Sequence, residues 1–174
     1  MKVLIIGGVA AGTKAAAKLK RMDRGMQVTL ITKDQDISYA GCGLPYYVGG
    51  LIDTREELIV NTPAKFAGLT GVEVLTGREA VKLDSTAKTV TARNHATGEE
   101  EHYTYDACIL ATGASPIVPP LPGMDLEGVF KLRTPDDAIG LRDYVKSTQA
   151  RRAVVVGGGF IGLEAAENLQ AQGL

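Results

Sequence analysis

Cys42 is the residue of this sequence whose surroundings most directly suggest chemistry. It stands between two glycines in the stretch ISYAGCGLPYYVGG, which runs from Ile37 to Gly50. A structural cysteine prefers an apolar strand or helix interior, whereas a glycine-rich turn lets the backbone approach another molecule. An accessible thiolate can exchange with disulfides or be oxidised to a sulfenic acid. Taken alone, this pattern leaves a structural cysteine and a redox-active cysteine both open.

The remaining cysteine and the histidines do not suggest a second chemical site. Cys108 lies in the apolar stretch ACILATG, where a small buried core residue is expected. His95 and His102 both lie in a polar, charged segment. None of these residues shows the close spacing of a metal motif or of a CxxC pair, so we expect neither a metal site nor an internal disulfide.

Two glycine-rich segments have the pattern of phosphate-binding turns. The first is VLIIGGVAAG, from Val3 to Gly12, and the second, with the same pattern of residue types, is AVVVGGGFIG, from Ala153 to Gly162. In each, four apolar residues typical of a buried strand precede the glycines, and a helix-forming stretch follows. The glycines are Gly7 and Gly12 in the first copy, with Val9 in the middle place, and Gly157, Gly159 and Gly162 in the second.

Each glycine of such a turn has a physical role. The first makes the strand-to-helix bend, the second lets the backbone approach a pyrophosphate, and the third allows close packing of helix on strand. The helix N-terminus then offers N–H groups and a positive dipole end to the phosphates. Two units of this kind predict two dinucleotides, one a bound redox cofactor and the other a diffusing one.

The elements that must position these residues follow from periodicity and turn signals. We expect an α/β chain in which parallel strands are joined by helices and an antiparallel meander is inserted. Expected strands are 2–6, 27–32, 72–75, 79–83, 88–92, 102–105 and 107–111. Expected helices are 11–22, 63–67 and 135–146, the last capped by Thr134 with Pro135 at its first position.

The sequence predicts that the chain is divided into three parts. Residues 1–116 form a first Rossmann-type domain, 117–150 a proline-rich linker with a connecting helix, and 151–174 the start of a second Rossmann-type unit. One strand and one helix cannot bury a sheet. We therefore expect the chain to be the front part of a longer protein and, on its own, to turn over poorly.

Composition excludes several classes of partner. With 19 Lys and Arg against 20 Asp and Glu, the net charge is −1, and tryptophan is absent. We therefore expect no nucleic-acid partner. The N-terminus resembles a signal peptide, but the same pattern recurs inside the chain, and no apolar run is long enough to span a bilayer. These features predict a cytoplasmic protein without a membrane partner.

The order GGVAAG, ISYAGCGLPYYVGG, ILATGASP and VVVGGGFIGLEAAENL closely resembles the flavin-dependent pyridine nucleotide–disulfide oxidoreductases. Within them it resembles the single-cysteine branch of coenzyme A disulfide reductases, NADH oxidases, NADH peroxidases and NAD(P)H persulfide reductases. The resemblance runs along all 174 residues, and the cysteine motif is its most specific part. It implies that the first unit is an FAD-binding domain, that the second unit binds NADH or NADPH, and that the full-length protein is a homodimer.

The resemblance also implies individual binding residues. FAD would contact Gly7, Gly8, Val9, Ala10, Ala11, Gly12, Thr32, Lys33, Asp34, Ala80, Val81, Ala111, Thr112 and Gly113. The nicotinamide cofactor would contact Gly157, Gly159, Phe160, Ile161 and Gly162, with Phe160 beside the flavin. Coenzyme A would contact Lys14, Lys18, Arg21, Ser38 and Gly41. Two places depart from the family pattern, since Thr32 stands where a carboxylate is usual and Gly41 where an asparagine is common.

In the resembling enzymes the cysteine has a redox role. Hydride passes from NAD(P)H to FAD, and the reduced flavin passes electrons to a sulfur beside it. Gly41 and Gly43 would leave room for flavin and substrate on either side of Cys42. Because this chain has no second cysteine nearby, the partner sulfur must come from outside. Cys42 then forms a mixed disulfide with a small thiol such as coenzyme A, or a sulfenic acid.

Four functions are weighed on these grounds. The leading hypothesis is NAD(P)H-dependent reduction of a small-molecule disulfide or persulfide through Cys42, with coenzyme A as the candidate thiol. The close alternative uses a Cys42 sulfenic acid to reduce peroxide or oxygen. A third is a flavin electron-transfer reductase for a protein partner, in which Cys42 is incidental. In the fourth, the chain is only a cofactor-binding module.

Overall fold

The computed structural model describes residues 1–174, which form two compact units. Unit 1 comprises Met1–Tyr39 and Asn61–Ala114, and unit 2 comprises Ala40–Val60 and Ser115–Leu174. The units do not follow sequence order, because the segment around Cys42 groups with the C-terminal helices. The α/β class expected from the sequence is confirmed, whereas the division at residues 116 and 150 stays a prediction.

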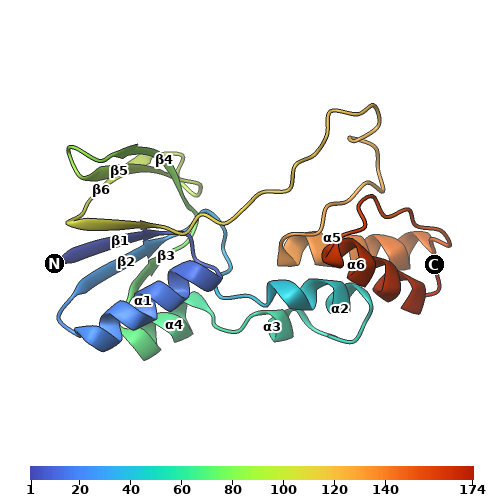
Figure 1. The fold of residues 1–174 in the computed structure, drawn as a ribbon, viewed down its shortest axis with the longest axis horizontal. Coiled ribbons are helices and arrows are strands. Elements are labelled where there is room, and N and C mark those ends of the chain that lie inside the picture. Colours follow the sequence, from blue (N-terminus) through green and yellow to red (C-terminus); the bar gives the residue numbers. More distant parts are fainter. The chain divides into compact units, whose positions relative to one another are not determined.

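Unit 1 is built on a four-stranded parallel sheet with the strand order β3-β2-β1-β7 (Figure 1). The strands are β1 (Lys2–Ile6), β2 (Gln27–Ile31), β3 (Glu73–Leu75) and β7 (Ala107–Leu110). Two helices of this unit are α1 (Ala10–Met22) and α4 (Pro63–Thr70). The helix expected over 11–22 and the strands expected near these positions are therefore present, within one or two residues of the predicted bounds.

The sheet is covered on both faces. Val3 and Ile5 of β1 belong to a buried cluster with α1 and α4, while Leu4 and Ile6 belong to a cluster with the antiparallel meander. Successive side chains of a strand point to opposite faces. A continuous apolar run is therefore what a parallel strand with two covered faces requires. Figure 1 shows α1 and α4 on one side of the sheet and the meander on the other.

The meander is a three-stranded antiparallel sheet, as the sequence predicts. Its strands are β4 (Arg78–Asp84), β5 (Thr89–Asn94) and β6 (Glu100–Thr104), in the order β4-β5-β6. Glu101 is the centre of its polar network. The carboxylate accepts hydrogen bonds from the Tyr103 hydroxyl, from Asn94 Nδ2 at 2.7 Å and from Arg78 Nε and Nη2 at 3.4 Å. These donors lower the pKa of Glu101, the Tyr103 hydroxyl first and Asn94 next.

This network makes the stability of the meander dependent on pH. Desolvation by burial, and then the hydrogen bond to Glu101, raise the pKa of Tyr103 to about 12, so its hydroxyl remains a donor at neutral pH. A carboxyl whose pKa is lowered by folding stabilises the native state above its unfolded pKa of about 4.3. That stabilisation is lost as the pH falls through the lower, folded pKa. The network is therefore weakened only in acid.

Glu101→Gln is expected to lower the free energy of unfolding at pH 7 by about 1 kcal/mol, because it removes a charge-assisted acceptor that is one-third exposed. It should also flatten the loss of stability below about pH 4.5. Urea unfolding of full-length wild type and variant at pH 7 and pH 3.5 measures both effects. Glu100→Gln, an exposed neighbour, is the matched control. Equal acid sensitivity of the two variants would contradict the prediction.

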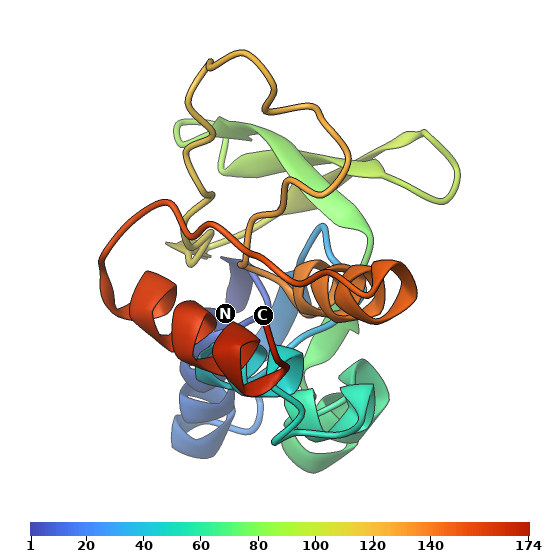
Figure 2. The ribbon, with the colours of Figure 1, turned by 90° about the vertical axis from the view of Figure 1, so that its right-hand side faces the viewer.

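Unit 2 is helical. Its elements are the 3₁₀ turn η1 (Gly41–Gly43) and the helices α2 (Leu44–Val48), α3 (Arg55–Leu58), α5 (Pro135–Thr148) and α6 (Phe160–Ala171). Helix α2 packs against both α5 and α6, and its Leu44, Tyr47 and Val48 form a buried cluster with Ala138 and Leu169. Figure 2 shows α2 in cyan, α5 in orange and α6 in red. Thr134 caps α5 with Pro135 in its first turn, as predicted.

The strand expected before the second glycine loop is absent, which corrects the sequence analysis. Residues 153–156 form no strand, and the side chains of Val154 and Val156 are 90% and 91% exposed. A strand needs a neighbour to accept and donate its backbone hydrogen bonds, and unit 2 contains no other strand. Residues 111–134 also contain no helix or strand. No helix of the structure is both long enough and apolar enough to cross a bilayer.

Candidate functional site

The carboxyl ends of the parallel strands meet at one edge of unit 1. Ile6 pairs with Ile31 on one side and with Leu110 on the other, and Ile31 pairs with Leu75. The residues that follow these strand ends therefore lie along the same edge, and they are Gly7, Thr32, Thr76 and Ala111. Ligands of open parallel sheets bind at this edge. Three of these four positions were named as FAD contacts from the sequence.

The first glycine loop leaves no space for side chains. Gly7 has φ +113°, a conformation that residues with a Cβ rarely adopt. A Cβ on Gly7 would overlap the carbonyl oxygen of Ala111, and one on Gly12 would overlap the carbonyl oxygen of Gly7. The loop therefore lies directly against the ATG stretch, and α1 begins directly on the end of β1. These are the close approaches expected of a dinucleotide-binding turn.

Thr32 lies beside this loop. It is buried, its N–H donates to the carbonyl of Leu75 at 3.1 Å, and its own carbonyl accepts from the N–H of Arg78 at 2.8 Å. A Cβ on Gly8 would lie 3.0 Å from the Thr32 methyl group and 2.7 Å from Ile37 Cγ2. This predicted FAD contact is thus fixed between β3 and β4 and packed on the glycine loop.

Other residues predicted to contact FAD lie in segments around this edge. Lys33 is exposed and Asp34 half-buried in the bend after β2. Val81 lies at an irregularity of β4, where the pairing register with β5 shifts between Ala80 and Lys82. A bulge of this kind leaves the extra residue outside the ladder and redirects the strand. Gly113 ends the ATG stretch with φ +69°.

Helix α1 starts without a cap. Its N-cap residue, Val9, offers no side-chain hydrogen bond, and the first turn holds no acidic residue. By contrast, Thr62 caps α4, and Thr134 and Asp137 form a full capping box on α5. The first N–H groups of a helix need partners. An uncapped start beside a glycine turn suits a phosphate group, so the residues present fit a dinucleotide.

The second glycine loop has the same local geometry, within unit 2. Gly157 has φ +115°, and a Cβ on Gly162 would overlap the carbonyl oxygen of Gly157. The N-cap of α6 is Gly159, with no side-chain cap and no acidic residue in the first turn. Phe160 and Ile161, predicted nicotinamide-cofactor contacts, are 87% and 62% exposed. The turn therefore forms although the strand before it does not.

Cys42 is an exposed free thiol in unit 2. It is the middle residue of the turn η1, which leads directly into α2, and Pro45 lies in the first turn of that helix. Cys108, the other cysteine, is a half-buried residue of β7 in unit 1 and packs at the edge of an apolar cluster. Burial raises the pKa of the Cys108 thiol, which disfavours its thiolate.

The two glycines around Cys42 have different surroundings. A Cβ on Gly43 would lie 3.0 Å from Ile52 Cδ1 and 3.2 Å from Leu58 Cδ2, whereas a Cβ on Gly41 would meet no atom within 4 Å. The sequence predicts that both glycines leave room for ligands. This is wrong for Gly43, because the protein's own core occupies the space beside it, and only Gly41 borders open space.

The residues predicted to contact coenzyme A lie on two segments of unit 1 and one of unit 2. Lys14, Lys18 and Arg21 are all exposed on α1. Ser38 has φ +51°, a left-handed conformation uncommon for serine, and its N–H donates to the carbonyl of Gly8 at 2.9 Å. Ser38 is thus tied to the first glycine loop, while Gly41 lies in unit 2.

The residues that hold the segment after Cys42 were not predicted from the sequence. Arg142 of α5 donates from Nη1 to the carbonyls of Ile52 and Asp53, and Gln172 Nε2, at the end of α6, donates to the carbonyl of Gly49 at 2.6 Å. These partners are separated in sequence by about 90 and 123 positions. No local pattern marks such pairs.

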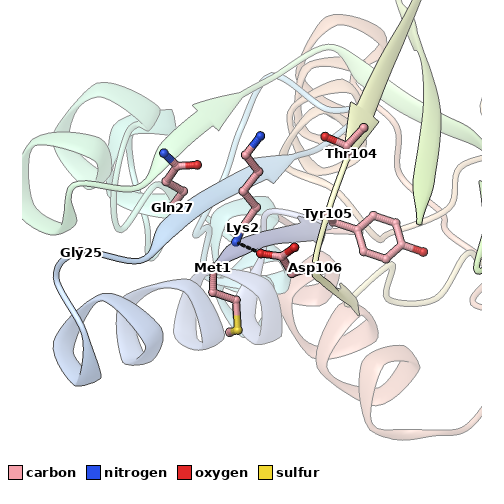
Figure 3. Close-up of a pocket in the computed structure, with 7 residues that line it drawn as sticks. All are labelled: Met1, Lys2, Gly25, Gln27, Thr104, Tyr105 and Asp106. Carbon is pink, nitrogen blue, oxygen red and sulfur yellow. Dashed lines mark hydrogen bonds between the residues drawn. The ribbon is translucent and has the colours of Figure 1, made fainter. Parts of the chain in front are cut away.

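A cavity of about 410 Å³ lies elsewhere on unit 1 (Figure 3). Its lining includes Lys2 and Gln27, the first residues of β1 and β2, and the backbone N–H of Lys2 donates to Asp106 Oδ2 at 2.6 Å. It therefore lies at the amino ends of these strands, opposite the edge that carries the glycine loop. We assign it no role in the site.

The whole chain is similar to proteins of one known family. The family model described as pyridine nucleotide-disulphide oxidoreductase matches residues 1–174. A coenzyme A disulfide reductase of Staphylococcus haemolyticus is 35% identical over 173 residues, which is 99% of this chain and 39% of the relative. An NADH oxidase of Methanocaldococcus jannaschii is 35% identical over 174 residues, which is 100% of this chain and 39% of the relative.

A solved structure is also similar to this chain in both sequence and fold. The structure of an NAD-dependent persulfide reductase from A. fulgidus has a TM-score of 0.94 and 38% identity, and it covers 100% of this chain and 33% of that protein. The chain thus spans well under half of the length of the relatives that it matches.

Proposed function

The chain belongs to the pyridine nucleotide-disulphide oxidoreductase family, and we propose that it forms part of an FAD-dependent NAD(P)H oxidoreductase that uses Cys42 to reduce a small-molecule disulfide or persulfide. Coenzyme A disulfide is the proposed substrate. The observation that carries the proposal is the state of Cys42, which is exposed, free and set in a turn between two glycines. The only other cysteine is half-buried in a strand of unit 1.

The cofactor contacts of the proposal rest on the two glycine loops. The Gly7–Gly12 loop, Thr32 and the ATG stretch would hold FAD, and the Gly157–Gly162 loop would hold NADH or NADPH. When bound, FAD supplies a two-electron carrier between the nicotinamide and sulfur. The chain contributes backbone N–H groups at the uncapped starts of α1 and α6, which would position the phosphates of each dinucleotide.

Cys42 would act as the nucleophile. Its thiolate attacks one sulfur of the substrate disulfide, a Cys42–thiol mixed disulfide forms, and the second thiol leaves as its thiolate. Two electrons that originate from NAD(P)H then cleave the mixed disulfide, which releases the remaining thiol and restores the Cys42 thiolate. No second cysteine of the chain is needed, because the mixed disulfide takes the place of an internal one.

Mass spectrometry of the full-length protein under non-reducing conditions tests this proposal. The expected result is a coenzyme A adduct on the peptide that contains Cys42, which reduction removes. Cys108 is the internal control and should carry no adduct. A sulfenic or sulfinic Cys42 without any thiol adduct would contradict the disulfide proposal and favour reduction of peroxide or oxygen. That second candidate is supported by the exposure of the thiol and by the similarity to an NADH oxidase.

The basic face of α1 is proposed to attract the phosphates of coenzyme A. Reversing two of its charges with Lys14→Glu and Arg21→Glu is expected to raise the KM for coenzyme A disulfide about tenfold, because two attractive contacts become repulsive. Steady-state kinetics of the full-length protein at low salt measure this effect. The matched control, Arg24→Glu with Lys82→Glu, changes the net charge equally at other exposed positions. Equal KM values in the two double variants would exclude the contact.

The remaining parts of the proposal concern the whole protein. We include in it a homodimer, which the family resemblance favours, and a cytoplasmic location, which the sequence features favour. Electron transfer to a protein partner with Cys42 incidental is the competing proposal, and the Cys42 variant described in the Discussion separates it from the others.

A further inference from the structure

Arg142 is a charged residue in the interior of unit 2 that the proposed chemistry does not use. Its side chain is 11% exposed, and its guanidinium lies 4.6 Å from the centre of the Tyr47 ring. Nη1 donates to the carbonyl of Ile52 at 3.0 Å and to that of Asp53 at 3.1 Å. One side chain of α5 therefore contacts both α2 and the segment that follows it.

The charge of Arg142 is not explained by an ion pair. Asp53 Oδ1 is 3.9 Å from Nη2, and the Asp53 side chain is 79% exposed, so this pair contributes little. Nε is buried without a hydrogen-bond partner. An apolar residue of similar length would fill the same space without the cost of desolvating a charge. The two carbonyl contacts and the stacking on Tyr47 are thus what the guanidinium provides.

Helix α5 is a firm support for this side chain. Its start has a capping box, formed by Thr134 and Asp137, and Ala138, one turn before Arg142, is fully buried in the apolar cluster of unit 2. The segment 51–53 is an irregular stretch between α2 and α3. Irregular segments open more easily than packed helices. The hydrogen bonds from Arg142 therefore attach this irregular segment to a packed helix.

A short path of contacts leads from this segment to the cysteine. Ile52, whose carbonyl Arg142 holds, packs its side chain on the backbone at Gly43, where a Cβ would be 3.0 Å from Ile52 Cδ1. Gly43 is the residue next to Cys42 and the last residue of η1. Tyr47, under the guanidinium, belongs to the helix that η1 begins. Arg142 thus contacts the helix that follows the turn and, through Ile52, reaches the last residue of the turn that carries the thiol.

We propose that Arg142 is a positioning residue for Cys42, which fixes the turn at residues 41–43 through Ile52, Gly43 and Tyr47. This inference rests on the proposed function of Cys42 as nucleophile. A nucleophile displaced by about 1 Å from its productive geometry can lose about a hundredfold in rate. The role of Arg142 is then to lower the positional freedom of the sulfur rather than to contact the substrate.

The test compares Arg142→Met with Asp53→Asn in the full-length protein. Methionine keeps an unbranched side chain but removes the donors, whereas Asp53→Asn removes only the weak ion pair. With rates normalised to bound FAD, Arg142→Met is expected to lower kcat for coenzyme A disulfide about 10- to 100-fold while KM changes less than about threefold. Asp53→Asn should match the wild type, and Arg142→Lys should restore part of kcat. A lower melting temperature with unchanged normalised kcat would overturn the proposal.

Two further measurements test whether Arg142 acts through Ile52 and whether it fixes the turn independently of catalysis. Ile52→Ala leaves the guanidinium in place but removes its contact path, and it should lower kcat in the same way; a wild-type kcat would exclude this path. Amide hydrogen exchange needs no substrate, and Arg142→Met should speed exchange over residues 41–53 about tenfold with β1 and β2 unchanged. Faster amide exchange in Arg142→Met, together with a wild-type protein that reduces no disulfide, would contradict the proposed function. It would still support the role of Arg142 in fixing the turn. Unchanged exchange overturns the positioning.

Discussion

Cys42→Ser is expected to lower NAD(P)H-dependent reduction of coenzyme A disulfide by the full-length protein on the order of a thousandfold or more. A serine hydroxyl is almost fully protonated at neutral pH and cannot form the mixed disulfide. The substitution is small and Cys42 is exposed, so folding and FAD content should not change. Steady-state oxidation of NAD(P)H with coenzyme A disulfide as acceptor measures the effect, and the flavin absorbance gives the cofactor content.

The matched control is Cys108→Ala. Cys108 is half-buried in β7, so its replacement should cost about 1 kcal/mol of stability and leave the turnover rate unchanged. Peroxide and oxygen are tested as acceptors in the same assays, since a sulfenic acid mechanism would also need Cys42. The electron-transfer alternative would be favoured by full activity of Cys42→Ser with a protein acceptor and by no activity of the wild type with any disulfide or persulfide acceptor.

Gly12→Ala is expected to abolish tight FAD binding, because the new methyl group would overlap the carbonyl oxygen of Gly7. Either α1 moves away from β1 or the loop opens, and both changes displace the N–H groups that would meet the phosphates. The accompanying loss of stability should be about 1–3 kcal/mol. FAD titration followed by flavin fluorescence, with urea unfolding of the same samples, measures the two effects.

Two alanine variants sharpen this experiment. Gly68 is also a helical glycine, in α4, but a Cβ there meets no atom within 4 Å. Gly68→Ala should therefore keep FAD and raise stability by about 0.5–1 kcal/mol. Gly162→Ala repeats the overlap in the second loop and should weaken NADH or NADPH binding while FAD stays bound. Normal FAD affinity in Gly12→Ala would contradict the assignment of the first loop.

Local sequence determined much of the fold and of the site. The continuous apolar run within Lys2–Ile6 predicts a parallel strand that is buried on both faces, and Thr134 with Pro135 marks the start of a helix. Gly7 and Gly157 have φ values of +113° and +115°, although only the first follows a paired strand. The turn conformation is therefore a property of the glycine pattern itself, since it depends on residues within a few positions.

Other features depend on residues that are far apart in sequence. The Val154 and Val156 pattern predicts a strand, but a strand exists only where another can pair with it, and unit 2 provides none. Whether Gly43 faces a ligand or the core likewise depends on Ile52 and Leu58, whose positions depend on the packing of α3 and α5.

Cys42 depends both on local sequence and on contacts between distant residues. Its place between two glycines, together with the family resemblance of the surrounding motif, predicts that it is the reactive residue. The support that Arg142 gives to its turn comes from a hydrogen bond across about 90 positions. Such a bond depends on how helices pack, and packing is decided by shape and burial summed over many residues rather than by any short motif. The sequence therefore predicts which atom reacts, and the tertiary structure decides which distant residues lie around it.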